Sequence, residues 1–290
     1  MIEIPDPGSI PGVADWIELS ISITGSGISK AAVASAIEGA AGEEVSEAFL
    51  TSIWRALDYR QQLYSRPFFK VEERTVEPQF DFRPPSEYLA CLLLSLFGVQ
   101  GDTQLPAKLF EKLTCEAIRR YLSGRGAVFG WPSDAGDRTE DEGESKIKRK
   151  IERLAKELHE RFCEAPAARF NDRGLDVVGW IPFSDKRPGQ VVVLLQCAAG
   201  HNWKDKLPVP IDAWLQYIHW ACNPLKAFAV PCVVDERDWH EMSKDKGVFL
   251  DRARILNLLS DGVSDRVLGN ELDSWVTNQL ADLNEYELHP

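Results

Sequence analysis

One apolar segment, about two thirds of the way along the chain, most restricts the possible folds. Residues 190–198 read QVVVLLQCA and are apolar except for Gln190 and Gln196. A short run of this kind, rich in β-branched residues, is typical of a strand buried on both faces, which needs helices on both sides of its sheet. Helical patterns stand before and after it in the chain, so the sequence predicts an α/β fold.

The neighbouring segments extend this sheet. Residues 175–183 have strand character and are separated from the apolar segment by the turn-rich SDKRPG, which predicts a hairpin. Two further strands are expected at residues 227–234 and in GVFL, at 247–250. Helix-period apolar positions predict the helices around them. These helices are expected at residues 106–122, 145–163, 211–220 and 251–259, with an exposed acidic loop at 132–143.

The first part of the chain has a different pattern. Helices are expected at residues 29–42, 46–63 and 86–98. Between them, residues 66–85 mix prolines with alternating apolar residues, which predicts an extended linker or an edge hairpin. We therefore expect a mostly helical N-terminal accessory region over residues 1–100 and an α/β domain over residues 101–290.

The charge is uneven along the chain. The net charge is −12, and the acidic excess lies in the first 60 and the last 20 residues. Residues 144–175 are locally basic, with nine Lys or Arg against six Asp or Glu. Strong non-specific binding to nucleic acid needs several clustered basic contacts, so this chain alone is not expected to show it. The acidic ends are read as aids to solubility or as surfaces for a basic partner.

Several classes of protein are disfavoured. The longest apolar stretch, residues 88–99, is too short to span a bilayer, and no secretory signal is visible, so a cytoplasmic protein without membrane contact is expected. The six cysteines include no C-x-x-C, and His219 with Cys222 and Cys232 lacks the second close pair of a structural zinc site. Neither a G-K-[ST] loop nor a G-x-S-x-G elbow occurs, so any ATP-driven step would need a partner.

Two polar residues stand out against the predicted hairpin. Asp176 lies near the start of its first strand, and Gln196 lies toward the end of its second. An antiparallel pairing brings both to one edge of the sheet. Burying an amide without partners costs roughly 1–3 kcal/mol, so Gln196 should have a partner, and Mg²⁺ accepts carboxylate and carbonyl oxygens. Lys204 and Lys206, directly after the second strand, are placed to orient a water molecule or to offset charge on a phosphate.

These residues resemble the PD-(D/E)XK, or restriction-endonuclease-like, nucleases over about residues 104–235. In that family a helix with a Glu precedes a hairpin that carries an Asp, then a Glu, Asp or Gln followed two residues later by Lys. The resemblance implies that Glu111, Asp176 and Gln196 hold Mg²⁺ or Mn²⁺. The position two after Gln196 is Ala198, so the lysine would have to be Lys206 or Lys204.

The resemblance implies a restriction-endonuclease-like core, with a mixed central sheet flanked by helices, and a metal-dependent DNA endonuclease activity. The GLDVV and QCAAGHNW segments are similar to nucleases of bacterial phage-defence and restriction systems. DNA affinity would then come from partner subunits, an ATPase or a helicase among them, or from a homo-oligomer. Two alternatives stay open: a catalytically inactive interaction subunit that keeps the nuclease fold, and an RNA nuclease.

Overall fold

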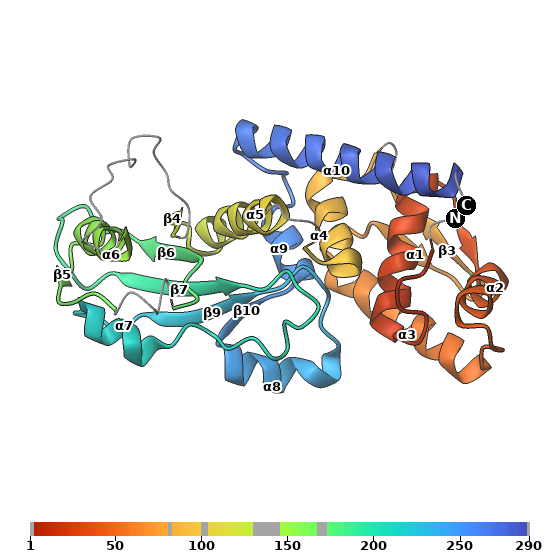
Figure 1. Cartoon of the computed structure of the whole chain (residues 1–290), viewed down its shortest axis with the longest axis horizontal. Coiled ribbons are helices and arrows are strands. Elements are labelled where there is room, and N and C mark those ends of the chain that lie inside the picture. The colour runs from red at the N-terminus through yellow and green to blue at the C-terminus, as the bar shows by residue number, and fades with distance from the viewer. Residues whose placement is uncertain (1–2, 81–82, 100–103, 130–145, 167–172, 289–290) are drawn as a thin grey trace.

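The computed structural model describes residues 3–80, 83–99, 104–129, 146–166 and 173–288. Two parts lie side by side along the long axis of the molecule, a helical part that contains the N-terminus and a part built on a five-stranded sheet (Figure 1). The loop predicted at residues 132–143 lies outside the described residues. Across the described part of the chain, no helix is both long and apolar enough to cross a bilayer.

The N-terminal part combines helices with a small antiparallel sheet. Serine side chains cap its first three helices, where Ser9, Ser29 and Ser46 accept hydrogen bonds from backbone amides of the first turn. Of the two structures expected for residues 66–85, a linker or an edge hairpin, the chain forms the hairpin, and the second strand of this hairpin also pairs with β1. The elements are α1 (Ile10–Thr24), β1 (Ile28–Ser29), α2 (Lys30–Ala41), α3 (Glu47–Leu63), β2 (Phe69–Val71), β3 (Thr75–Pro78) and α4 (Ser86–Phe97).

The larger sheet has the strand order β10-β9-β7-β6-β4 and is mixed. Its antiparallel half is formed by β4 (Arg125–Val128), β6 (Val177–Ile181) and β7 (Val191–Cys197). The parallel half continues through β9 (Leu225–Ala229) and β10 (Val248–Leu250). The apolar segment of residues 190–198 therefore forms the central strand, as its composition predicts.

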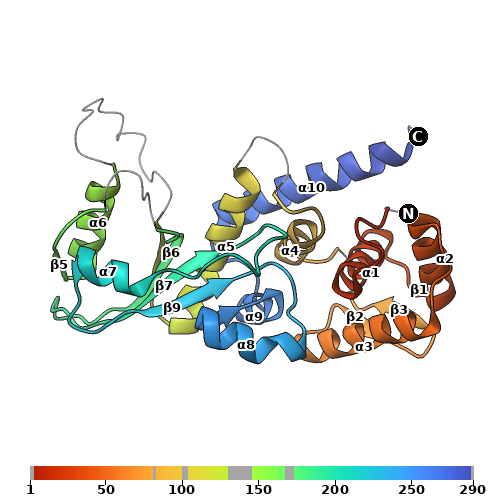
Figure 2. The same cartoon turned by 60° about the horizontal axis from the view of Figure 1, so that its bottom comes forward.

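Helices cover both faces of this sheet. On one face α5 (Leu105–Leu122) packs over β4, β6 and β7, and its apolar side joins the large core cluster shared with the N-terminal helices. On the other face a second cluster joins β6 and β7 to α6 (Lys146–Glu157) and α7 (Ile211–Tyr217). The remaining helices are α8 (Glu236–Lys246), α9 (Arg252–Leu258) and α10 (Arg266–Leu288), and α10 lies along α4 and α5 (Figure 2). The predicted α/β fold with a helix-flanked mixed sheet is confirmed.

Two predicted helices are shorter than the sequence pattern indicates. α6 ends at Glu157 instead of residue 163, because His159 takes a left-handed backbone conformation with φ of 57°. The chain then forms β5 (Arg161–Phe162), which pairs with β8 (Ile218–His219) and so ends α7 before residue 220. The strand predicted at residues 227–234 is also shorter in the structure, where β9 ends at Ala229.

A buried ion cluster connects the two parts of the molecule. Arg60 on α3 and Arg252 at the start of α9 both donate to Asp15 and Glu18 of α1, at 2.7–3.0 Å. All four side chains are at most 4% exposed. Tyr64 and Tyr88 also donate to Glu18, and Ser95 donates to Asp15. The division at residue 100 remains a prediction, but these charges require the N-terminal helices and α9 to pack together.

Candidate active site

The hairpin of β6 and β7 fixes Asp176 at one end of the central strand. Val177 pairs with Leu195, so Asp176 stands immediately before β6 and beside the end of β7. Its backbone amide donates to the Leu195 carbonyl at 3.0 Å, and its carboxylate accepts from the Cys197 amide at 2.7 Å. The Asp176 carboxylate is therefore held on the last residue of the sheet's central strand.

A cavity of about 360 Å³ lies at this end of the sheet. Three of the five residues predicted for the site line it, namely Asp176, Glu111 from α5 and Lys206 from the loop after β7. The structure thus brings together two carboxylates and an amine that are up to 95 positions apart in the sequence. Cys197, Asn202 and Asp205 also line this cavity.

Lys206 is positioned by its backbone and by its side chain. Its amine donates to the Cys197 carbonyl at 2.8 Å, next to the amide that donates to Asp176. Its own carbonyl accepts a 2.7 Å hydrogen bond from the amine of Lys246, the last residue of α8, which is only 3% exposed. The loop that carries Lys206 is therefore fastened both to the central strand and to α8.

Cys197 lies among the charged groups that line this cavity. Burial raises the pKa of the Cys197 thiol well above its usual value, and the nearby carboxylates of Asp176 and Glu111 raise it further. The nearby Thr114 hydroxyl and the charge of Lys206 act in the opposite direction. The thiol is consequently protonated at neutral pH, which disfavours Cys197 as a nucleophile.

The two other predicted residues lie outside this cavity. Side chains alternate along a strand, and Leu195 and Cys197 face α5, so Gln196 faces the opposite side of the sheet. There its amide packs against Gly174, where a Cβ atom would come within 2.9 Å of the Gln196 nitrogen. The Lys204 amine is paired with Asp238 at 2.8 Å and lines a different cavity. Their proposed roles remain predictions.

The oxygen donors at the cavity suit a cation that keeps several water ligands better than a cation coordinated entirely by protein side chains. Mg²⁺ is commonly held by one or two carboxylates, with water completing its coordination. Asp176 and Glu111 supply two carboxylates of this kind. Within the described residues there is no group of three or more His, Cys, Asp or Glu side chains suited to holding a metal ion. Two carboxylates at one cavity are the kind of donors that Mg²⁺ or Mn²⁺ accepts, and binding of either ion here remains a prediction.

Comparison with known proteins gives little additional information. No protein-family model matches the chain, and no curated protein matches it. Among solved structures, the chain is similar to the restriction endonuclease FokI at 9% sequence identity and a TM-score of 0.20. That match covers 86% of this chain but only 44% of the FokI chain, so this chain spans less than half of its length.

Three residues with polar or ionisable side chains line the cavity but are not among the site residues predicted from the sequence. Cys197 lies inside the predicted apolar strand, and Asn202 and Asp205 lie between the predicted elements. All three follow Gln196 within ten positions, in a polar segment directly after the buried strand. The ends of central strands are common places for functional loops, so this segment carried the available signal.

Proposed function

We propose that this protein is a metal-dependent phosphodiesterase that cleaves DNA. The observation that supports this proposal is the convergence of Glu111, Asp176 and Lys206 on one cavity at the end of the central sheet. Two carboxylates can hold the metal ion for hydrolysis of a phosphodiester, and an amine can stabilise the negative charge that develops on the phosphate.

Each residue has a distinct role in this proposal. Asp176 and Glu111 would hold Mg²⁺ or Mn²⁺, which when bound supplies Lewis acidity and a more acidic water. Lys206 keeps two ammonium protons beyond the one donated to Cys197, and these would orient the attacking water or offset charge on the phosphate. The nuclease resemblance also implies that Gln196 is a metal ligand. Gln196 does not line this cavity, so the structure gives no support for that role.

The charge of the chain bears on how DNA reaches this site. With a net charge of −12, the chain alone has little non-specific attraction for a polyanion. We therefore propose that partner subunits or further copies of the chain contribute DNA affinity, as in a cytoplasmic component of a bacterial anti-phage defence or restriction system. An ATPase or a helicase would be a suitable partner, because the sequence has no Walker loop of its own.

Plasmid cleavage tests the proposal. Purified protein is incubated with supercoiled plasmid and Mg²⁺ or Mn²⁺, with EDTA as the metal-free control, and with single-stranded RNA in a parallel reaction. We expect nicked or linear DNA only when metal is present, and no products from Asp176→Ala. Cleavage of RNA but not DNA would replace the DNA nuclease by an RNA nuclease, and an undiminished rate for Asp176→Ala would remove this site from the reaction.

One difference between this sequence and the nuclease pattern favours a second function, that of a non-catalytic interaction subunit. Ala198 stands where the nuclease pattern has its lysine, and the amine that reaches the cavity comes from a later loop. Under this alternative the fold would be retained for assembly alone. Absence of metal-dependent cleavage of DNA and RNA, together with tight binding to a protein encoded beside it, would favour the interaction subunit.

A further inference from the structure

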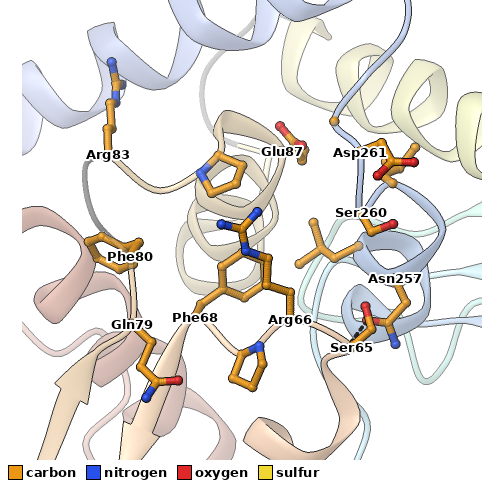
Figure 3. A pocket seen from close by; sticks show the side chains of 15 residues that line it. Ser65, Arg66, Phe68, Gln79, Phe80, Arg83, Glu87, Asn257, Ser260 and Asp261 are labelled. Atoms are coloured by element: carbon orange, nitrogen blue, oxygen red, sulfur yellow. Dashed lines mark hydrogen bonds between the residues drawn. The ribbon is translucent and has the colours of Figure 1, made fainter.

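A second cavity, of about 600 Å³, lies away from the candidate active site. It is formed by the segments on either side of the β2–β3 hairpin, by the first turn of α4 and by the end of α9 with the turn that follows (Figure 3). None of the residues that line it lines the cavity of Asp176. Its volume lies within the range of sites for small organic molecules.

The walls of this cavity are fastened by hydrogen bonds. The Asn257 side chain accepts from the Ser65 amide at 2.7 Å and donates to the Leu63 carbonyl at 2.8 Å, which joins α9 to the end of α3. The Arg120 guanidinium of α5 donates to the carbonyls of Leu258 and Gly262 at 3.1 and 2.6 Å. A cavity with walls held in this way requires little ordering when a ligand enters.

An aromatic ring forms part of the lining and is fixed in orientation. The Phe68 ring is stacked on Tyr88, with centroids 4.0 Å apart and planes 11° apart, and it meets the Tyr64 ring edge-on at 5.1 Å. Phe68 and Phe80 are both only partly buried. Fixed rings that keep exposed surface are suited to packing against a flat ring of a ligand.

Charged groups of both signs surround this aromatic lining. Figure 3 shows the Arg66 guanidinium projecting into the cavity, with Glu87 and Asp261 on the far side. Within the part of the chain that the structure describes, no hydrogen bond or ion pair engages the Arg66 side chain. Burial raises the pKa of the Glu87 carboxyl, and Asp273 adds to this effect, against a hydrogen bond from its own backbone and the charge of Arg120.

The aromatic ring and the charges of both signs restrict the kind of ligand that this cavity can bind. A simple anion would be attracted by Arg66 but would find acceptors, Glu87 and Asp261, across the cavity. A simple cation would be repelled by the charge of Arg66. A ligand with an anionic group, a flat ring and hydrogen-bond donors on that ring matches all of the groups present.

We propose that this cavity binds a nucleotide. Its phosphate would pair with Arg66, its base would pack against Phe68, and the amino edge of the base would face Glu87 and Asp261. This site is separate from the proposed nuclease centre, and its occupancy does not depend on any cleavage activity.

Isothermal titration calorimetry on the full chain tests the proposal, with AMP, GMP, CMP and UMP as probes and adenosine and inorganic phosphate as partial ligands. We expect at least one nucleotide to bind with a dissociation constant below about 1 mM, and each partial ligand to bind at least about tenfold more weakly. Arg66→Ala should weaken nucleotide binding by about tenfold or more, because a charge-assisted contact to phosphate is lost.

The matched control is Arg74→Ala, which removes an exposed arginine from the same hairpin region but outside the cavity. This control should bind nucleotide like the unchanged protein, whereas Phe68→Leu, which keeps apolar bulk and removes the ring, should weaken binding of both nucleotide and nucleoside. Circular dichroism confirms that each variant is folded. The proposal is overturned if no nucleotide binds at millimolar concentration, or if Arg66→Ala and Arg74→Ala have equal affinities.

Discussion

Asp176 contributes to both the fold and the proposed chemistry, because one carboxylate accepts a backbone hydrogen bond and also lines the cavity. The bond from the Cys197 amide is short, at 2.7 Å, and lies at the end of the central strand. A substitution that keeps an oxygen acceptor should preserve this bond, while one that removes the acceptor should leave a backbone amide without its partner.

Two variants at this position should therefore separate stability from activity. Asp176→Asn keeps an acceptor and should change the free energy of unfolding by less than about 1 kcal/mol, whereas Asp176→Ala should lower it by about 1–3 kcal/mol. Both should lose metal-dependent cleavage, because the charged metal ligand is gone. Urea denaturation and plasmid nicking measure the two effects, and full activity of Asp176→Asn would contradict the assigned role.

The two lysines after β7 are predicted to differ in importance. Lys206 donates to Cys197 at the cavity, whereas Lys204 pairs with the exposed Asp238 elsewhere. If Lys206 stabilises charge in the transition state, Lys206→Ala should lower the cleavage rate by about 10²–10³-fold. Lys204→Ala is the matched control and should change the rate by less than about threefold, since exposed ion pairs contribute little. Equal losses in the two variants would reject this assignment.

At the residue scale, the sequence indicated which residues gather at the cavity better than it indicated the direction of each side chain. Asp176 could be placed because it precedes a recognisable strand, and Glu111 because it lies on a clear amphipathic helix. The side of the sheet that Gln196 faces could not be predicted, because a strand that is apolar on both faces has no polar alternation to mark its orientation. Nothing in the sequence showed which of the two lysines folds back to Cys197.

At the scale of secondary-structure elements, the contact between α5 and the sheet depends on a residue without a side chain. Gly179 lies in the middle of β6, beneath Leu122 and Ile118 of α5. A Cβ atom there would come within 2.9 Å of a Leu122 methyl carbon and 3.0 Å of Ile118. α5 carries Glu111, so this close approach sets the position of one carboxylate of the site.

Gly179→Ala should therefore lower the free energy of unfolding by about 1–3 kcal/mol, as overpacked core sites do. It should also lower cleavage activity through displacement of α5. Gly39→Ala is the control, because Gly39 lies within α2 with no atom within 4 Å of a new Cβ. That change should be neutral or stabilise by up to about 1 kcal/mol. Thermal unfolding of both variants checks the prediction, which would be wrong if Gly179→Ala were as stable as the unchanged chain.

Among the elements that the sequence does not predict, β5, β8 and α10 escape prediction for identifiable reasons. β5 and β8 are two residues each, and their pairing joins segments more than 50 positions apart, which no local pattern encodes. α10 is not predicted because the acidic composition of the last 20 residues resembles that of an exposed chain end. Its buried residues Leu268, Leu272 and Val276 nevertheless recur at helical spacing.

At the scale of the whole molecule, the stability of the fold should depend strongly on the buried cluster of Asp15, Glu18, Arg60 and Arg252. Arg252→Met keeps much of the volume but leaves two buried carboxylates with one guanidinium. Breaking a buried ion pair from one side costs about 3–5 kcal/mol, so this variant should unfold at much lower urea concentration. Lys30→Ala, which breaks a partly exposed pair with Glu47, should cost less than about 1 kcal/mol. Similar losses in both variants would contradict the importance of the buried cluster.

The same cluster predicts how stability depends on pH. Burial opposes ionisation of Asp15, but Arg252, Arg60 and Ser95 together lower its pKa below the usual value near 4. A lowered pKa in the folded state contributes stability that is present above the unfolded-state pKa and is lost as the pH falls through the folded-state pKa. Urea titrations should therefore show stability declining below about pH 4. In Asp15→Asn this part of the decline should be smaller, and an unchanged profile would exclude Asp15 as a source of the acid sensitivity.

The position of Arg252 also bears on how the gene can be divided for expression. A fragment that starts at residue 101 would retain this arginine and lose every carboxylate that the cluster gives it, along with the helices that cover it. Water would then have to replace the protein groups that surround the Arg252 guanidinium in the intact chain. Truncation at the apparent border between the helical and the sheet-containing parts should therefore yield aggregating material, and a nuclease assay on that fragment would be uninformative about the intact chain.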